Sequence, residues 1–283
     1  MYEIIFLLVL GFCYLLFAVI QDFKSREIAD WLNYSLIIFG LSFRFFYSLF
    51  NENSFNFFLQ GLIGFFIFLV LANLFYYSRL FAGGDAKLMI ALGTILPLDY
   101  SFSSNILLFL NFLSCFFIAS LIYVLISSIF LTIKNFKSFK IRFFKEIKSQ
   151  KRLIIFSWIF LFFSIILNFI LYNFNFAFLG FFLLVLTYSY IYSKALDESC
   201  MIKEVSTKDL TEGDWLYKDI KLKRETIKSK WEGLNKEEIR KLKVELKKVK
   251  IRQGIPFSPT FLIGFILFVI LYFCNIYLWN SFW

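Results

Sequence analysis

The chain has 283 residues, of which 60% are hydrophobic and 23% aromatic, and 30 Lys and Arg residues against 20 acidic ones give it a formal charge of +10. A soluble domain averages about 45–50% apolar residues, so much of this chain is expected to lie within a lipid bilayer. The sequence contains no histidine, which excludes a Ser-His-Asp or Cys-His nucleophile, a histidine metal site and an imidazole base. Acid–base chemistry at neutral pH is therefore left to carboxylates, Lys, Tyr or Cys.

The cysteines and glycines also exclude several kinds of site. The four cysteines are too far apart in the sequence to form the C-x-x-C pair of a zinc or redox site; they are Cys13, Cys115, Cys200 and Cys274. The sequence has neither of the Gly-rich motifs that bind nucleotide phosphates. These kinds of metal, redox and nucleotide site are therefore not expected.

Hydrophobic runs predict the membrane helices, because a spanning helix needs about 20 largely apolar residues. The clear runs are residues 2–20, 31–50, 57–77, 106–133, 153–171, 174–192 and 261–278. An eighth run, residues 88–102, is weaker because Gly93, Pro97 and Asp99 interrupt it. The first run carries Glu3, no basic residue and no cleavage site with small residues, so we expect it to remain as a membrane helix and not to be removed as a signal peptide.

These runs predict an all-α polytopic membrane protein with about eight transmembrane helices and a cytoplasmic, mainly helical segment before the last span. The expected parts are a membrane domain of about five spans at 1–133, a basic loop at 134–152, two spans at 153–193, a charged segment at 194–257 and the last span at 258–283. In the charged segment, Ile239, Leu242, Leu246 and Val249 follow the spacing of one amphipathic helix. Residues 136–147 show a similar pattern.

The basic residues predict the orientation. All of them except Arg44 fall in four connections, which eight spans place on one side; they are residues 21–30, 78–87, 134–152 and 194–253. The positive-inside rule makes that side cytoplasmic, which puts both termini outside. The same residues should attract anionic lipids, whereas the acidic residues mixed among them argue against a nucleic-acid partner. Arg44 is expected to extend to the outer interface, or else to form an ion pair within the bundle.

Two aspartates stand out at the predicted cytoplasmic end of the bilayer. Asp22 ends the first span, and Asp85 lies in the connection of residues 81–87. Charged groups near membrane depth tend to be functional when they face the bundle interior. Gly83 and Gly84 are expected to allow close backbone approach, or a positive φ, that aims Asp85 inward.

Two carboxyl groups that share a site do not both ionise easily, so one stays protonated. The charged one can then deprotonate a water while the protonated one polarises a substrate carbonyl, which predicts peptide hydrolysis without histidine or metal. The structural alternatives are that Asp22 is an ordinary interfacial charge and that Asp85 caps a helix beginning at Ala86.

Both segments resemble the archaeal prepilin and preflagellin peptidases, which are membrane aspartic proteases of the G-x-G-D type. The first segment reads Asp22-Phe23-Lys24-Ser25-Arg26-Glu27-Ile28-Ala29-Asp30-Trp31-Leu32, and the second reads Gly83-Gly84-Asp85-Ala86-Lys87-Leu88. Two positions depart from the family pattern: Ala82 replaces the first Gly, and Ala29 stands where Pro is often found. Residues 209–216 and 254–264 resemble the tail of the larger archaeal prepilin peptidases.

The resemblance implies that Asp22 and Asp85 are catalytic, that Gly83, Gly84 and Lys87 support the second motif, and that residues 1–133 are the catalytic domain. It implies no metal or cofactor. The implied substrates are type IV pilin-like or archaellin-like precursors, whose leader would be cleaved at the cytoplasmic face of the cell membrane.

Two other readings remain open from the sequence. A presenilin-like intramembrane protease would hold both aspartates deeper within its spans. A transporter or an assembly scaffold could use the pair to bind a cation.

Overall fold

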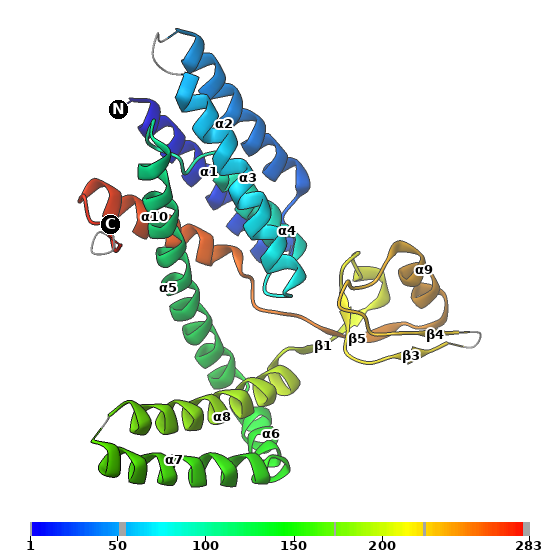
Figure 1. Ribbon diagram of the computed structural model, residues 1–283. Coiled ribbons are helices and arrows are strands. Elements are labelled where there is room, and N and C mark those ends of the chain that lie inside the picture. The colour runs from blue at the N-terminus through cyan, green and yellow to red at the C-terminus, as the bar shows by residue number, and fades with distance from the viewer. Residues whose placement is uncertain (1, 51–54, 173, 223–224, 280–283) are drawn as a thin grey trace. The chain divides into compact units, whose positions relative to one another are not determined.

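Long helices make up most of the computed structural model, which describes residues 2–50, 55–172, 174–222 and 225–279 (Figure 1). Within these residues, six helices are long and apolar enough to cross a membrane: α1 (Tyr2–Ser25), α2 (Asp30–Phe50), α3 (Phe55–Tyr77), α5 (Phe102–Lys134), α7 (Lys151–Leu171) and α8 (Asn175–Cys200). Helix α10 (Ser258–Phe273) is apolar but shorter. A helix satisfies its own backbone hydrogen bonds in lipid, so the apolar runs fold as expected and the all-α polytopic prediction is confirmed for them.

The chain divides into two compact units. One holds the residues up to Leu125 together with those from Pro256 onward, and the other runs from Ile126 to Ile255. Helix α5 continues from the first unit into the second. The second unit is therefore inserted between two pieces of the first.

The first unit is built around the short helix α4 (Gly83–Gly93), which packs against α2 and α3, while α1 packs against α2 and α10. The side chains of Leu88, Met89 and Leu92 are completely buried. Helix α4 therefore lies in the interior of this unit and has little surface for lipid.

The weak span predicted at residues 88–102 is helical only up to Gly93. The backbone from Thr94 to Ser101 forms turns and bends. Pro97 explains the break, since proline has no N–H to donate and disfavours a helical residue before it. Irregular backbone at membrane depth is tolerated where protein covers it, and Leu96 and Leu98 are indeed buried.

Arg44 hydrogen-bonds the backbone at this break, so the prediction that it extends to the outer interface is wrong. Its side chain is completely buried. The guanidinium donates to the carbonyl oxygens of Thr94 at 2.8 Å, Phe57 at 3.0 Å and Ile95 at 3.2 Å, and also to that of Pro97. Three of these oxygens belong to the turns that follow α4 and the fourth to the first turn of α3, and the five-donor fork of arginine supplies them with hydrogen bonds.

Glycines let α3 approach the end of α4. A Cβ atom at Gly64 would lie 2.3 Å from the carbonyl oxygen of Gly93, and one at Gly61 would lie 2.4 Å from Cδ of Arg44. Small residues at helix contacts allow such close backbone packing in membrane proteins.

The second unit contains α7, α8 and the basic helix α6 (Phe136–Ser149), which confirms the helix predicted at 136–147. Helix α8 packs against both α6 and α7. Glu146 of α6 is buried between Arg142 and Lys194, with Nζ of Lys194 2.8 Å from its Oε2. Charged side chains thus tie α6 to α8.

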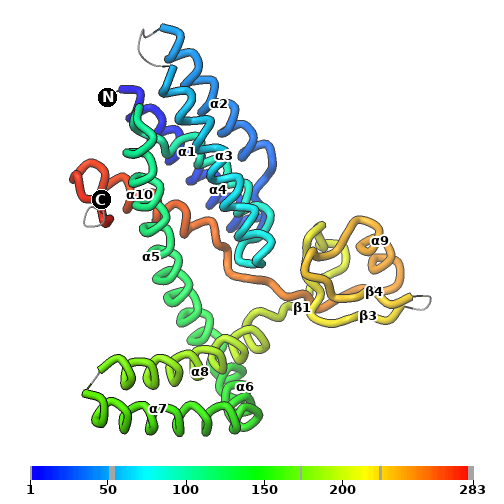
Figure 2. Tube along the Cα trace, viewed as in Figure 1, coloured from blue at the N-terminus to red at the C-terminus, as the bar shows by residue number. Residues whose placement is uncertain are grey.

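The charged segment that follows is a small α/β fold, so the prediction of a mainly helical segment is wrong. Its elements are β1 (Ile202–Ser206), the 3₁₀ helix η1 (Thr207–Asp209), β2 (Trp215–Leu216), β3 (Ile220–Lys221), β4 (Thr226–Ile227), α9 (Lys236–Glu245) and β5 (Lys248–Arg252). Strands β1, β5 and β2 form an antiparallel sheet in that order, and β3 pairs with β4. Because β1 and β5 pair along their whole length, the chain enters and leaves this fold at adjacent points (Figure 2).

The helix predicted to include Leu246 and Val249 ends at Glu245 instead. Asn235 and Glu238 form a capping box at its start, and Ile239 and Leu242 are buried as expected. Lys248 and Lys250 are exposed whereas Val249 and Ile251 are buried. This alternation with period two is typical of a strand, and it overrides the helical spacing of the earlier residues.

Candidate active site

Asp22 lies in the last turn of α1, three residues before the helix ends at Ser25. The helix terminates where Arg26 adopts a left-handed conformation, with a φ of 61°, and donates its N–H to the carbonyl oxygen of Asp22 at 3.0 Å. A left-handed residue just beyond the last turn is a common helix stop. Asp22 is 7% exposed as a residue, so it is buried in the first unit and is not an exposed interfacial charge.

Asp85 lies in the first turn of α4, which begins at Gly83 and not at Ala86 as the capping alternative assumed. Its side chain is 8% exposed. Gly83 and Gly84 are both helical and neither has a positive φ. A Cβ at Gly84 would lie 3.4 Å from Cβ of Ile28, an ordinary contact. A Cβ at Gly83 would lie 4.0 Å from Cε2 of Tyr76. The expected positive φ is therefore wrong, and the glycines are not sterically required at these contacts.

The two aspartates are brought into one electrostatic environment. Asp85 lies at the start of α4, ahead of the weak span predicted at residues 88–102. Burial, and then the negative charge of Asp22, raise the pKa of Asp85 above its ordinary value, and a backbone hydrogen bond with Ala82 partly opposes this. A carboxyl group in these surroundings retains its proton to higher pH than an exposed aspartate does.

An ion pair joins the two sequence motifs beside the aspartates. Nζ of Lys87, two residues after Asp85, pairs with Oδ1 of Asp30, eight residues after Asp22. Both side chains are substantially exposed. Lys87 thus links the start of α4 to the start of α2.

Sequence reasoning missed Ser258, whose backbone N–H donates to Oδ2 of Asp22 at 3.1 Å. Ser258 is the first residue of α10, and Pro259 follows it in the first turn. Proline at the start of a helix is a recognised signal, so the Ser-Pro pair could have located the helix start but not its contact with Asp22. A helix N-terminus carries partial positive charge, which favours the negative charge of a carboxylate.

Aromatic rings fix the connection that leads into α4, the helix of Asp85. The ring centroid of Phe81 lies 5.0 Å from that of Phe75 on α3, 5.8 Å from that of Phe116 on α5 and 5.8 Å from that of Phe261 on α10. Aromatic pairs at such distances contribute beyond their area of burial. Phe81 therefore anchors this connection to three helices.

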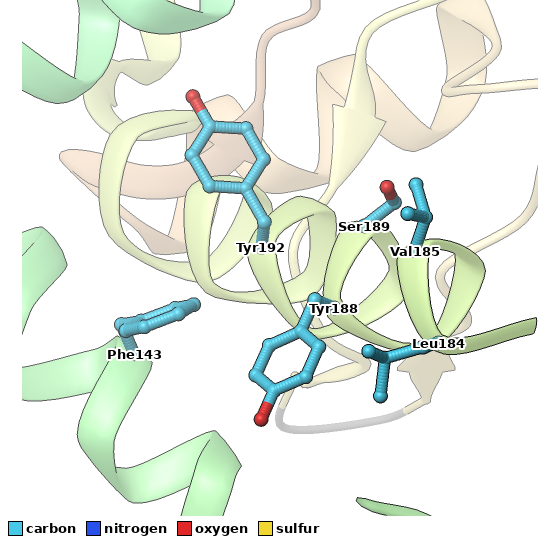
Figure 3. A pocket seen from close by; sticks show the side chains of 6 residues that line it. All are labelled: Phe143, Leu184, Val185, Tyr188, Ser189 and Tyr192. Atoms are coloured by element: carbon cyan, nitrogen blue, oxygen red, sulfur yellow. The ribbon is translucent and has the colours of Figure 1, made fainter. Parts of the chain in front are cut away.

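A separate pocket of about 410 Å³ lies in the second unit and contains neither aspartate. Figure 3 shows its lining from α8, where Tyr188 and Tyr192 project from the helix, and from Phe143 of α6. The remaining lining residues, Leu184, Val185 and Ser189, bring no carboxylate or amine. The lining thus includes two tyrosines but no carboxyl pair of the kind that Asp22 and Asp85 offer. Among the residues that the structure describes, no cluster of Cys, Asp and Glu could hold a metal ion.

Comparison with known proteins gives the family. A preflagellin peptidase of Methanococcus maripaludis (strain C6) is 31% identical over 170 residues, which cover 52% of this chain and 72% of that protein. The chain belongs to the type IV leader peptidase family. The sequence pattern of that family matches residues 9–133, a range that includes both Asp22 and Asp85. A preflagellin peptidase of Methanocaldococcus jannaschii is 36% identical over 89 residues, or 31% of this chain and 37% of that protein.

No solved structure matches the chain. The resemblance to the archaeal peptidases is thus confirmed, and together with the six long apolar helices it identifies a multi-pass membrane peptidase. The family match ends at residue 133, so it does not reach Ser258, which lies on α10.

Proposed function

We propose that this protein is an aspartic endopeptidase that removes the leader from type IV pilin-like or archaellin-like precursors, with Asp22 and Asp85 as its catalytic pair. The observation that carries the proposal is that two buried carboxyl groups, from segments 63 positions apart in the sequence, interact electrostatically in a chain of the leader peptidase family. Membership of the family indicates that the protein cleaves peptides, and the carboxyl pair could catalyse that reaction.

The two carboxyl groups have different surroundings, which suggests different roles. Asp22 accepts a hydrogen bond from the N-terminus of α10, which suits the ionised partner. Asp85 has a raised pKa, which suits the partner that holds a proton. A pair in which one carboxyl group is charged and the other holds a proton is what general acid–base catalysis requires.

In this mechanism Asp22 takes a proton from a water molecule while the water oxygen forms a bond to the scissile carbonyl carbon. Asp85 donates its proton to the carbonyl oxygen, so that a neutral tetrahedral diol forms. The C–N bond then breaks as the leaving nitrogen takes the proton from Asp22. Asp85 recovers a proton from the diol as the carbonyl of the new carboxyl group re-forms.

The position of the aspartates favours cleavage at a membrane boundary over cleavage within a span. Asp22 is three residues from the end of α1, and Asp85 is in the first turn of α4. A presenilin-like enzyme would hold both groups well inside its helices. The distribution of Lys and Arg supports a cytoplasmic site, outside termini and contact of the basic segments with anionic lipid.

The substrate follows from the relatives, which are named preflagellin peptidases. We propose a precursor with a short leader and a long apolar helix that lies in the bilayer, so that its junction meets the aspartates. Residues 1–133 would form the catalytic membrane domain, with the loop, spans and charged segment of residues 134–257 and the last span of residues 258–283 as additions to it.

The test is cleavage of such a precursor by the full chain in detergent or in membranes, followed by the mobility shift of the mature product. Asp22→Asn and Asp85→Asn should each abolish cleavage, because the pair needs one charge and one proton. Asp99→Asn is the matched control: Asp99 accepts a hydrogen bond from the N–H of Ser101 through Oδ1, which asparagine retains. Wild-type cleavage by either pair variant would refute the catalytic pair. Mapping the cut by mass spectrometry inside the apolar helix would favour the presenilin-like reading instead.

A further inference from the structure

The N-terminus of α10 carries an unusual polar side chain next to Asp22. Ser258 is completely buried. Its Oγ has no hydrogen-bond partner among the described residues. Buried hydroxyl groups are nearly always paired, so one that is not needs an explanation.

The backbone of the same residue fixes where this hydroxyl lies. Ser258 N–H is 3.1 Å from Oδ2 of Asp22. Because Oγ is joined to that nitrogen through Cα and Cβ, it lies within a few ångströms of the Asp22 carboxylate. The unpaired hydroxyl is therefore part of the same small polar region as the candidate catalytic pair.

The neighbouring polar groups of α10 are already occupied. Pro259 has no N–H, and the N–H and hydroxyl of Thr260 both donate to the carbonyl oxygen of Phe257, at 3.0 and 2.7 Å. Of these three residues in the first turn, only Ser258 donates its N–H to Asp22, and only its hydroxyl has no partner among the described residues. A hydroxyl can both donate and accept a hydrogen bond, as a peptide backbone requires.

We propose that Ser258 is a substrate-binding and positioning residue of the active site: its N–H holds the Asp22 carboxylate, and its hydroxyl binds the backbone of the precursor beside the scissile bond. This rests on the proposed function, because it needs Asp22 to be catalytic. It makes α10 a part of the active site, although the residues that match the family end before it.

Ser258→Ala tests the hydroxyl while keeping the backbone N–H that holds Asp22. The kcat/KM for precursor cleavage should fall about five- to tenfold, as expected for the loss of one hydrogen bond. The fall should be mainly in KM, because binding of the substrate backbone is lost while the Asp22 contact remains. The melting temperature in detergent should not fall, because the removed hydroxyl has no partner in the free protein.

Ser120→Ala is the matched control, since the Oγ of Ser120 is another buried hydroxyl without a partner among the described residues but is carried by α5. It should leave kcat/KM unchanged. Equal kinetics for Ser258→Ala and Ser120→Ala would overturn the inference. Asp22→Asn and Asp85→Asn, measured in parallel, distinguish failure of this inference from failure of the proposed function. If they abolish cleavage while Ser258→Ala cleaves like wild type, only the role of Ser258 is wrong.

Discussion

Arg44 on α2 donates from Nε to the carbonyl oxygen of Thr94, 2.8 Å away and 50 positions along the chain. The same guanidinium reaches three further carbonyl oxygens, so one side chain binds both the turns that follow α4 and the start of α3. Without it, several carbonyl groups would be buried without donors, at a cost of about 1–3 kcal/mol each.

We therefore expect Arg44→Met to lower the free energy of unfolding by about 3 kcal/mol or more. Arg44→Lys should recover only part of this, because an ammonium group cannot present the arginine fork. Thermal unfolding in detergent measures the loss. Arg240→Met, at an exposed position of α9, should have little effect. Unfolding of Arg44→Met at the wild-type temperature would contradict the role given to Arg44.

The raised pKa of Asp85 predicts a pH-dependent gain in stability on replacing it. A carboxyl group whose pKa is higher in the folded than in the unfolded state favours folding less as pH rises from the unfolded value through the folded one. Above both values the folded protein holds a buried charge at a cost. Asp85→Asn should thus melt higher than wild type at pH 8, and the difference should disappear as pH falls below about 4. A difference that is independent of pH would show that desolvation of the carboxylate is not its cause.

Two glycine substitutions should have opposite outcomes. Gly64→Ala puts a methyl group 2.3 Å from a backbone oxygen, which neither helix can avoid without moving, so we expect a loss of about 1–3 kcal/mol. Gly83→Ala places its methyl group 4.0 Å from Cε2 of Tyr76, an ordinary contact, at the first residue of α4, so we expect a gain of about 0.4–1 kcal/mol from the lower conformational entropy of the unfolded chain. Denaturation of both variants in one detergent compares them directly. If Gly83→Ala is the less stable of the two, the packing described around α3 and α4 is incorrect.

The ion pair of Lys87 with Asp30 should contribute little to stability, since both groups are exposed and such pairs yield about 0.2–1 kcal/mol. Lys87→Met should therefore change the melting temperature only slightly, and less in 0.5 M salt, where the pair is screened. The double variant Lys87→Asp with Asp30→Lys should restore the wild-type value at low salt. A large loss in the single variant that salt does not diminish would point to a contact other than this pair.

The sequence allowed the membrane helices to be predicted and drew attention to two aspartates that the structure buries, because both features leave local signals. Hydrophobic runs record which segments enter lipid, and a carboxylate beside a span stands out against apolar neighbours. The small α/β fold was mistaken for helix because Ile239 and Leu242 do lie on a helix, while Val249, seven residues further on, is buried by a strand that pairs with β1.

The contacts of Arg44 and Ser258 could not be predicted in the same way. Each depends on a partner distant in the sequence, and neither residue type indicates that partner. An arginine near the end of a span most often reaches water. Only the fold shows that α4 stops at Gly93 and that the turns after it present carbonyl groups to Arg44.

The hydrogen bond between Asp22 and Ser258 spans 236 positions of the chain. During synthesis Asp22 and Asp85 are made early, whereas α10 is added only after the whole second unit has emerged. A nascent chain therefore contains both carboxyl groups long before the helix that holds one of them. The order of translation therefore means that the hydrogen bond from Ser258 to Asp22 forms only after α10 has been made.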